Sequence, residues 1–336
     1  MKIQIIAYLL IIILLSACKN KFDVDTSNIK LDLKIERFDT AFYKLNDLDT
    51  DKMYYKISQL RNKNKDFFDL YCTQVIGIGL PENISFLSNL SDFFLYGDEQ
   101  NLFNSVWEKF PIEQDFLTKE LTNAFEHYLY YFGNDTIPRI YTCVSGFNVS
   151  VFTSDKIIGI SLDKYLGSDF RPYNQMFEKY LVRRMDKRYI AVDVMKAYAM
   201  QTFPFNDSVR NVICKMIYEG RIQYFVDAML PQTNDTIKWG YSKMQWQWAN
   251  KYESKIWDYL VDQKALFSNK NIDIKTLTEE SPFTAPFGQY SAPRAGNFIG
   301  YKIVQSFMNN NKNVSIAELM SIRDYMYIYN NSHYRP

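Results

Sequence analysis

The residue best placed to do chemistry lies near the N-terminus, where the sequence L-S-A-C ends at Cys18. Lys2 and the apolar residues 3–15 have the order of a signal peptide, and this stretch is too short to cross about 30 Å of hydrocarbon as a helix. A leucine three positions before a cysteine, with small residues between them, is the spacing at which a thiol receives a diacylglyceryl group before cleavage. Cys18 is therefore predicted to become a lipidated N-terminus, because acyl chains such as palmitate form a stable membrane anchor when two or more are present.

A second candidate for chemistry is a pair of helices predicted at residues 188–203 and 206–230. Apolar residues recur at helical spacing in both, which predicts that both helices are buried. The second helix carries Glu219 followed by a glycine. This order resembles the core of a zincin metallopeptidase, in which the first helix supplies H-E-x-x-H and the second supplies a glutamate ligand.

The first of these helices contains no histidine, and the best register places Met195, Lys196 and Ala199 where His, Glu and His would stand. A thioether, an ammonium group and a methyl group cannot replace the imidazole ligands of a catalytic zinc ion. A zincin-like scaffold in this chain would therefore be degenerate, and we expect neither a metal nor another cofactor.

Three residues are candidate contacts for a ligand or a partner: Glu219, Arg294 and Lys196. Glu219 is either a relic ligand contact or an ordinary paired carboxylate, since an unpaired buried carboxylate is costly. We predict that Lys196 pairs with it across the two helices, beneath a small pocket lined by Tyr198 and Tyr224. Arg294 could clamp a partner carboxylate with two hydrogen bonds, or it could form an intramolecular salt bridge.

Composition and missing motifs exclude several classes of function. The net charge is +1, from 39 basic and 38 acidic residues, so nothing favours nucleic-acid binding. The two histidines, His127 and His333, are too far apart in sequence to suggest a metal site, and the chain lacks G-x-S-x-G, Walker A and G-x-G-x-x-G sequences. Cys72, Cys143 and Cys214 are an odd number and allow at most one disulfide. No catalytic residue is predicted.

The patterns along the chain predict an α+β fold, mostly helical with a small antiparallel or mixed sheet of about four strands. Residues 1–17 are predicted to be the signal peptide, 18–30 a polar tether without packed structure, and 31–336 a single domain. Strands are expected at residues 31–35, 137–144, 148–153 and 157–162, the last three as an antiparallel meander. Further helical windows fall at residues 51–77, 82–96, 98–110, 112–132, 175–186, 242–263, 293–310 and 315–321.

Six sequence stretches distributed along residues 37–308 carry a resemblance to a known family. They are R-F-D at 37–39, S-L-D-K-Y-L-G at 161–167, M-I-Y-E-G-R-I-Q-Y at 216–224, M-L-P at 229–231, W-D-Y-L-V-D-Q-K-A-L-F-S at 257–268 and P-R-A-G-N-F-I-G-Y-K-I-V-Q-S-F-M at 293–308. In their order and spacing they resemble the gliding-motility lipoprotein GldB family of Bacteroidetes. The resemblance implies a role in gliding and the associated type IX secretion. It provides no catalytic motif to carry over.

The leading hypothesis is therefore a membrane-anchored envelope protein that binds other proteins of the gliding or secretion apparatus without being an enzyme. One alternative is an active or degenerate zincin-like metallopeptidase. Another is a glycan-binding lipoprotein, because 17% of the residues are aromatic and Trp246 and Trp257 would share one face of a single helix.

The residues after Cys18 bear on location. Lys19 stands where an inner-membrane retention signal would have aspartate, and Asn20 and Lys21 interrupt any acidic run of the kind linked to surface display. We therefore expect a periplasm-facing protein, with the outer membrane favoured over the inner.

Overall fold

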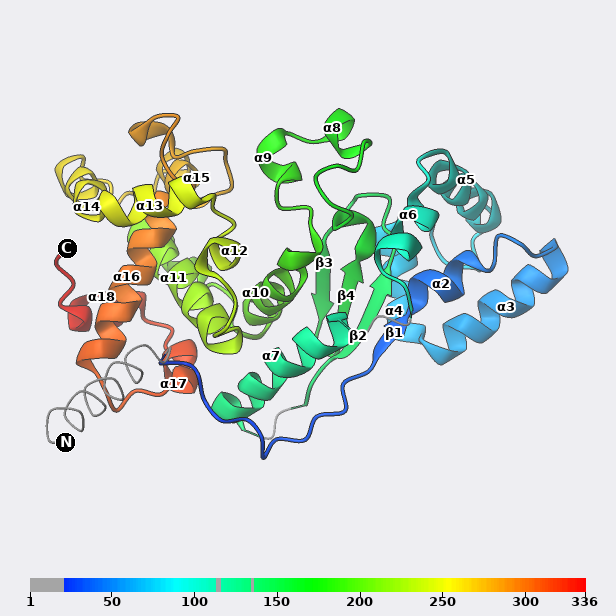
Figure 1. Cartoon of the computed structure of the whole chain (residues 1–336), viewed down its shortest axis with the longest axis horizontal. Coiled ribbons are helices and arrows are strands. Elements are labelled where there is room, and N and C mark those ends of the chain that lie inside the picture. Colours follow the sequence, from blue (N-terminus) through cyan, green and yellow to red (C-terminus); the bar gives the residue numbers. More distant parts are fainter. Residues whose placement is uncertain (1–20, 113–115, 134–135) are drawn as a thin grey trace, which may run out of the picture.

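The computed structural model describes residues 21–112, 116–133 and 136–336 (Figure 1). Helices make up most of it, around one small mixed sheet, which confirms the predicted α+β class. Cys18 and the signal peptide at 1–17 lie outside the described residues, so the predicted lipidation stays a prediction. None of the helices in the described ranges is long and apolar enough to cross a bilayer.

The sheet has the strand order β1-β2-β4-β3. Its strands are β1 (Ile35–Arg37), β2 (Arg139–Cys143), β3 (Val151–Ser154) and β4 (Ile157–Ser161). β2 pairs in parallel with both β1 and β4, and only β3 is antiparallel to its neighbour. The predicted antiparallel meander is therefore wrong, and the first strand begins at Ile35 rather than at residue 31.

The physical reason for this topology lies in burial and in one carboxylate. Every residue of β4 is buried, as suits a central strand, whereas β3 is only half-buried and lies at the edge. The chain between β2 and β3 is held by the buried Asp163, which accepts backbone N–H groups from Ser145 at 2.9 Å and Phe147 at 2.6 Å. After this loop the chain forms β3 at the edge of the sheet. It then turns back as β4, which lies between β2 and β3.

Helices of the first half lie mainly on one side of the sheet and extend to one end of the molecule (Figure 1). They are α2 (Phe38–Tyr43), α3 (Thr50–Lys63), α4 (Lys65–Leu70), a π-helical turn (Tyr71–Val75), α5 (Phe86–Glu99), α6 (Leu102–Lys109) and α7 (Phe116–Phe132). The second half contains α8 (Tyr173–Met176), α9 (Lys179–Val182), α10 (Ile190–Thr202), α11 (Val212–Met229), α12 (Asp235–Trp239), α13 (Lys243–Lys251), α14 (Glu253–Asp262), α15 (Asn271–Thr278), α16 (Ala295–Asn310), α17 (Ile316–Ser321) and α18 (Tyr325–Ser332).

Several predicted helices have different ends. The window at 242–263 divides into α13 and α14 at Tyr252, and the window at 175–186 contains only the end of α8 and the short α9. α11 begins after Asn211, whose side chain accepts the Cys214 N–H, whereas Asn206 caps a short 3-10 turn instead. The window predicted at 315–321 is confirmed as α17, which Ser315 opens with a capping box that includes Glu318.

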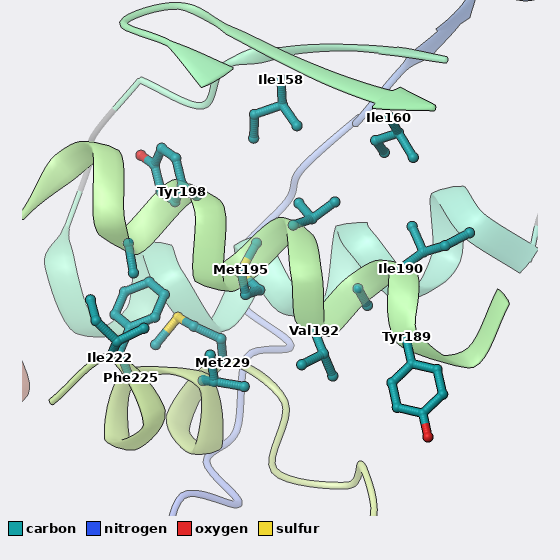
Figure 2. Close-up of a cluster of buried hydrophobic side chains, with 14 of the residues drawn as sticks. Ile158, Ile160, Tyr189, Ile190, Val192, Met195, Tyr198, Ile222, Phe225 and Met229 are labelled. Carbon is teal, nitrogen blue, oxygen red and sulfur yellow. The ribbon is translucent and has the colours of Figure 1, made fainter. Parts of the chain in front are cut away.

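α10 and α11 occupy the middle of the apolar core (Figure 2). Ile190, Met195 and Tyr198 on α10 lie between the sheet and α11, whose side chains on this side include Phe225 and Met229. Every residue of α11 is buried except Lys215 and Glu219. α11 is thus a central helix, covered on nearly all sides, rather than an amphipathic one with a single apolar stripe.

α16 packs on α11 at a pair of glycines. A Cβ atom added to Gly220 would lie 2.4 Å from the backbone carbon of Gly300, and one added to Gly300 would lie 1.8 Å from the Met216 carbonyl oxygen. The two backbones therefore approach so closely that no side chain fits between them. This contact fixes how α16 lies against the central helix.

The first described residues are also part of the packed structure. Phe22 is buried and its ring meets that of Tyr224 on α11 edge to face, with 5.0 Å between the centroids. Gln232 donates a side-chain hydrogen bond to Asp23 at 2.9 Å. The prediction that the tether has no packed structure is wrong at Phe22, because this apolar side chain packs on the ring of Tyr224 and both residues are buried.

We expect Gly300→Ala to lower the free energy of unfolding by about 3 kcal/mol or more, because the new methyl group would collide with backbone atoms that no rotamer change can move. Asn309→Ala, at an exposed position of the same helix, is the matched control and should change stability by less than about 0.5 kcal/mol. Urea unfolding of both variants measures the difference. Equal stability of the two would contradict the close backbone contact.

Candidate functional site

A group of charged side chains from distant parts of the chain meets around the end of α12. It consists of Arg183, Arg184, Asp193, Lys196, Glu280 and Arg294, and is called the α12 cluster below. Asp193 and Lys196 project from α10, the two adjacent arginines follow α9, Glu280 follows α15, and Arg294 is the N-cap residue of α16. Two of the three sequence candidates, Lys196 and Arg294, thus belong to one site.

Three of the cations bind consecutive backbone carbonyls. Lys196 Nζ donates to the Lys238 carbonyl at 2.9 Å, an Arg294 Nη donates to that of Trp239 at 2.7 Å, and an Arg183 Nη donates to that of Gly240 at 2.8 Å. These carbonyls end α12, where Gly240 takes the left-handed conformation with φ of 65°. Carbonyls at the end of a helix have no partner within it and carry partial negative charge, so cations are stabilised there.

Two carboxylates bind Arg184, and one of them also contacts Arg294. Arg184 donates one Nη to Glu280 at 2.6 Å and the other to Asp193 at 3.3 Å. An Arg294 Nη lies 3.4 Å from the same Glu280 carboxylate, which makes Arg294 part of an intramolecular ion pair. The hydroxyl of Tyr165 donates to Asp193 at 3.0 Å.

These surroundings lower the pKa of Lys196. Burial lowers its pKa to about 7, and the positive charges of Arg294 and Arg184 add to the effect, while Asp193 and Glu219 oppose it. The ammonium form is therefore in balance with the neutral amine near neutral pH. The pKa of the Arg183 guanidinium is also lowered, chiefly by burial.

Glu219 pairs with Lys215, one turn earlier on α11, at 2.8 Å. The predicted Lys196–Glu219 pair is therefore wrong. Lys215 and Glu219 are the two positions of α11 that are not buried, so they meet on one face of the same helix without crossing to α10. The Lys196 ammonium binds a carbonyl of α12 instead. The sequence pattern could not reveal this partner of Lys196, because the carbonyl belongs to a different helix that lies far along the chain.

The positions that would hold zinc in a zincin do not face one another in a polar site. Met195 and Ala199 are completely buried in the apolar core, with Met195 beside Met229 and below the sheet (Figure 2). Among the residues that the structure describes, no three His, Cys, Asp or Glu side chains are grouped so that they could hold a metal ion. Cys72, Cys143 and Cys214 are buried, and each is a free thiol.

The two tryptophans considered for a glycan platform belong to different helices. Trp246 on α13 lies near Trp239 and Phe298, whereas Trp257 on α14 meets Tyr334 edge to face. Both rings pack against the core, so they do not form one flat surface for a sugar.

The model of the protein family described as "Gliding motility protein GldB" matches residues 19–336 of this chain. The chain belongs to the GldB gliding-motility family. No curated protein matches it, and no solved structure matches it either.

Sequence reasoning missed four members of the α12 cluster of this GldB-family protein: Arg183, Arg184, Asp193 and Glu280. Nothing local indicated the two acids, because their partners lie on other elements.

A groove lies between α2 and α3, far along the molecule from α16 (Figure 1). It has a volume of about 640 Å³ and is called the α2–α3 groove. Its apolar lining includes Ala41, Leu45, Leu48, Leu60 and Ile112. Every charged side chain that lines it is basic, namely Arg37, Lys44, Lys56 and Lys63. A smaller cavity of about 450 Å³ shares part of this lining and adds an aromatic wall at Tyr43 and Trp107.

Lys196→Met should remove a pH dependence of stability. The unfolded chain keeps the lysine proton up to its ordinary pKa near 10.5, whereas the folded protein releases it above about 7. Between these values the unfolded state binds more protons, so wild type should gain stability relative to the variant as pH rises, by up to about 1.4 kcal/mol per pH unit.

Urea unfolding of both proteins at several pH values from 6.5 to 9.5 checks this expectation. Lys215→Met, which removes a half-exposed lysine of the neighbouring helix, serves as the control. A constant difference between wild type and Lys196→Met across this range would contradict the lowered pKa.

Proposed function

We propose that this protein is a lipid-anchored envelope component that supports gliding motility or type IX secretion by binding other proteins. The family match over residues 19–336 is the observation that carries the proposal. The L-S-A-C sequence at Cys18 supports the anchor. We favour a non-enzymatic role because the residues at the zincin ligand positions point into the core or toward α12. The residues after Cys18 favour a periplasm-facing protein, on the outer membrane rather than the inner.

The anchor would hold one end of the molecule close to the membrane. Phe22 is packed on Tyr224, and Cys18 precedes it by only four residues. Four residues reach at most about 14 Å even when fully extended. A lipid on Cys18 would therefore keep the end of α11 near the bilayer surface instead of allowing the protein to move freely on a long tether.

The α2–α3 groove lies toward the other end of the long axis, where α3 is drawn in Figure 1. An apolar floor with a wholly basic rim is complementary to an acidic segment that carries apolar side chains. We propose such a segment of an envelope protein as its occupant. Buried apolar contact would supply affinity, while Lys44, Lys56 and Lys63 would select against basic or neutral segments.

Cys18→Ala should release the protein from membranes or misplace it while leaving the fold intact. The thioether is the anchor in this proposal, and the packed structure begins after it, at Phe22. Fractionation after a carbonate wash, with circular dichroism of the released protein, tests this expectation. A variant that stays firmly in the membrane fraction would refute the lipid anchor.

Reversing two charges at the groove should abolish recognition of an acidic partner. The probe is a designed 16-residue amphipathic peptide of Glu and Leu, compared with its Lys and Leu counterpart. Wild type should bind the acidic peptide at least about tenfold more tightly, and Lys44→Glu with Lys56→Glu should remove that preference. Lys251→Glu with Lys275→Glu, at exposed positions on α13 and α15, makes the same change in net charge away from the groove.

Fluorescence anisotropy of labelled peptides measures these affinities. Equal binding by both double variants would place the interaction elsewhere. At the level of the cell, the binding role fails if no envelope protein co-purifies from membranes and a deletion strain grows and secretes normally.

A further inference from the structure

The α12 cluster contains more positive charge than its own carboxylates neutralise. Four cations, Arg183, Arg184, Lys196 and Arg294, meet two carboxylates, Asp193 and Glu280, which leaves an excess of two charges when Lys196 is protonated. Glu219 also acts on Lys196, but its own charge is balanced by Lys215. The partial charge of the α12 carbonyls offsets only part of this excess, since a helix end is equivalent to about half an elementary charge. Partly buried cations repel one another strongly when they are not neutralised.

The cluster also has hydrogen-bond donors to spare. A guanidinium has five N–H donors and an ammonium has three. The Nε atoms of Arg183, Arg184 and Arg294 are buried and have no hydrogen-bond partner in the protein. Lys196 Nζ has one acceptor, the Lys238 carbonyl. Capping α12 uses one donor of each of three cations, and Gln245, Asp193 and Glu280 accept further N–H groups of the arginines. The three Nε–H groups remain without an acceptor.

Glu280 bridges two guanidinium groups of the cluster. Its carboxylate contacts both Arg184 and Arg294, and 31% of its side chain is exposed. It follows the end of α15, in an irregular stretch that reaches α16 at Arg294. Arg294 itself holds a left-handed backbone conformation, with φ of 53°, which is uncommon for a residue with a side chain and marks a position constrained by its contacts.

We propose that the α12 cluster binds the phosphate group of a ligand, and that Glu280 occupies part of this site until the ligand displaces it. A tetrahedral dianion brings more negative charge than the single carboxylate it displaces, and it accepts hydrogen bonds from several directions. Guanidinium groups are well suited to such oxyanions because their paired N–H groups bind two oxygens at once. This site is independent of both the lipid anchor and the α2–α3 groove.

Isothermal titration calorimetry on the purified mature protein tests the site with three probes. Sulfate and inorganic phosphate are the free anions, and glycerol 3-phosphate is the soluble counterpart of a phospholipid headgroup. Measurable binding that Arg294→Gln weakens at least about tenfold is the expected result. Tighter binding of glycerol 3-phosphate than of phosphate would assign the site to a phosphate ester, and equal binding would assign it to the free oxyanion.

Substitution of Glu280 tests whether its carboxylate competes with the ligand. Glu280→Gln removes the internal competitor and should tighten the binding of all three probes. Glu279→Gln, at the neighbouring exposed position, removes the same charge without touching the cluster and should leave affinity nearly unchanged. A structural ion pair alone would predict no gain in affinity from Glu280→Gln.

Lys196 supplies a second readout with sulfate, which remains a dianion from pH 6 to pH 8. The charged groups that act on the lysine are Arg294 and Arg184, which lower its pKa to about 7, and Asp193 and Glu219, which oppose them. If the ammonium form is the one that binds, apparent affinity should fall about tenfold between pH 6 and pH 8, following the protonated fraction. Lys196→Met should bind more weakly and lose this pH dependence.

The proposal is overturned if none of the three anions binds to the folded protein. It is also overturned if Arg294→Gln and Lys196→Met bind them as wild type does. Thermal unfolding of each variant establishes that it is folded, and Arg183→Gln provides a second variant of the cluster should Arg294→Gln fail to fold.

Discussion

At Gly220 and Gly300 the backbones of α11 and α16 lie so close that a single methyl group could not be placed between them. This approach buries α11 on nearly all sides and sets the direction of α16 across it. Because Arg294 is the N-cap residue of α16, the glycine contact also determines where its guanidinium lies. Packing between two central helices thus positions a charged residue some two turns away, beside α12 and α10. A shift of α16 along α11 would disturb the core and the charged cluster together.

The α12 cluster shows how a short helix can organise charge from much of a chain. α12 has only five residues, yet its last carbonyls accept hydrogen bonds from three cations that are far apart in sequence. Burial and mutual repulsion work against this concentration of positive charge, and they are also what brings the pKa of Lys196 down to about 7. The α12 cluster of this GldB-family protein therefore contains a lysine whose charge changes near neutral pH.

The same fold separates two kinds of surface. The N-terminal segment packs on α11 through Phe22, which places the start of the described chain at the core helix. The α2–α3 groove lies far from this point, among the helices that precede β2 (Figure 1). The proposed anchor at one end and the basic, apolar groove at the other are consistent with the proposed role, in which the protein is held at a membrane and binds a partner away from it.

The sequence by itself determined the α+β class, the family and most of the helices. These follow from local information: apolar spacing, capping residues such as Ser315, and the recurrence of short sequence stretches in one order. The locations of β2, β3 and β4 also followed from the alternation of side chains, although the position of β1 and the pairing of β2 with β4 did not. Strand order depends on the route that the connection takes, and here that route is set by hydrogen bonds to the buried Asp163.

Only the tertiary structure decided which charged residues meet. Lys196 and Arg294 were recognisable as unusual from their neighbours in sequence, but their contacts were not, because the acceptor carbonyls belong to α12 and the shared carboxylate is Glu280. Glu219 illustrates the opposite case, since its partner Lys215 is one turn away on the same helix and was overlooked in favour of a more distant one. Spacing along one helix is fixed by 3.6 residues per turn, whereas a contact between elements depends on how the whole core packs.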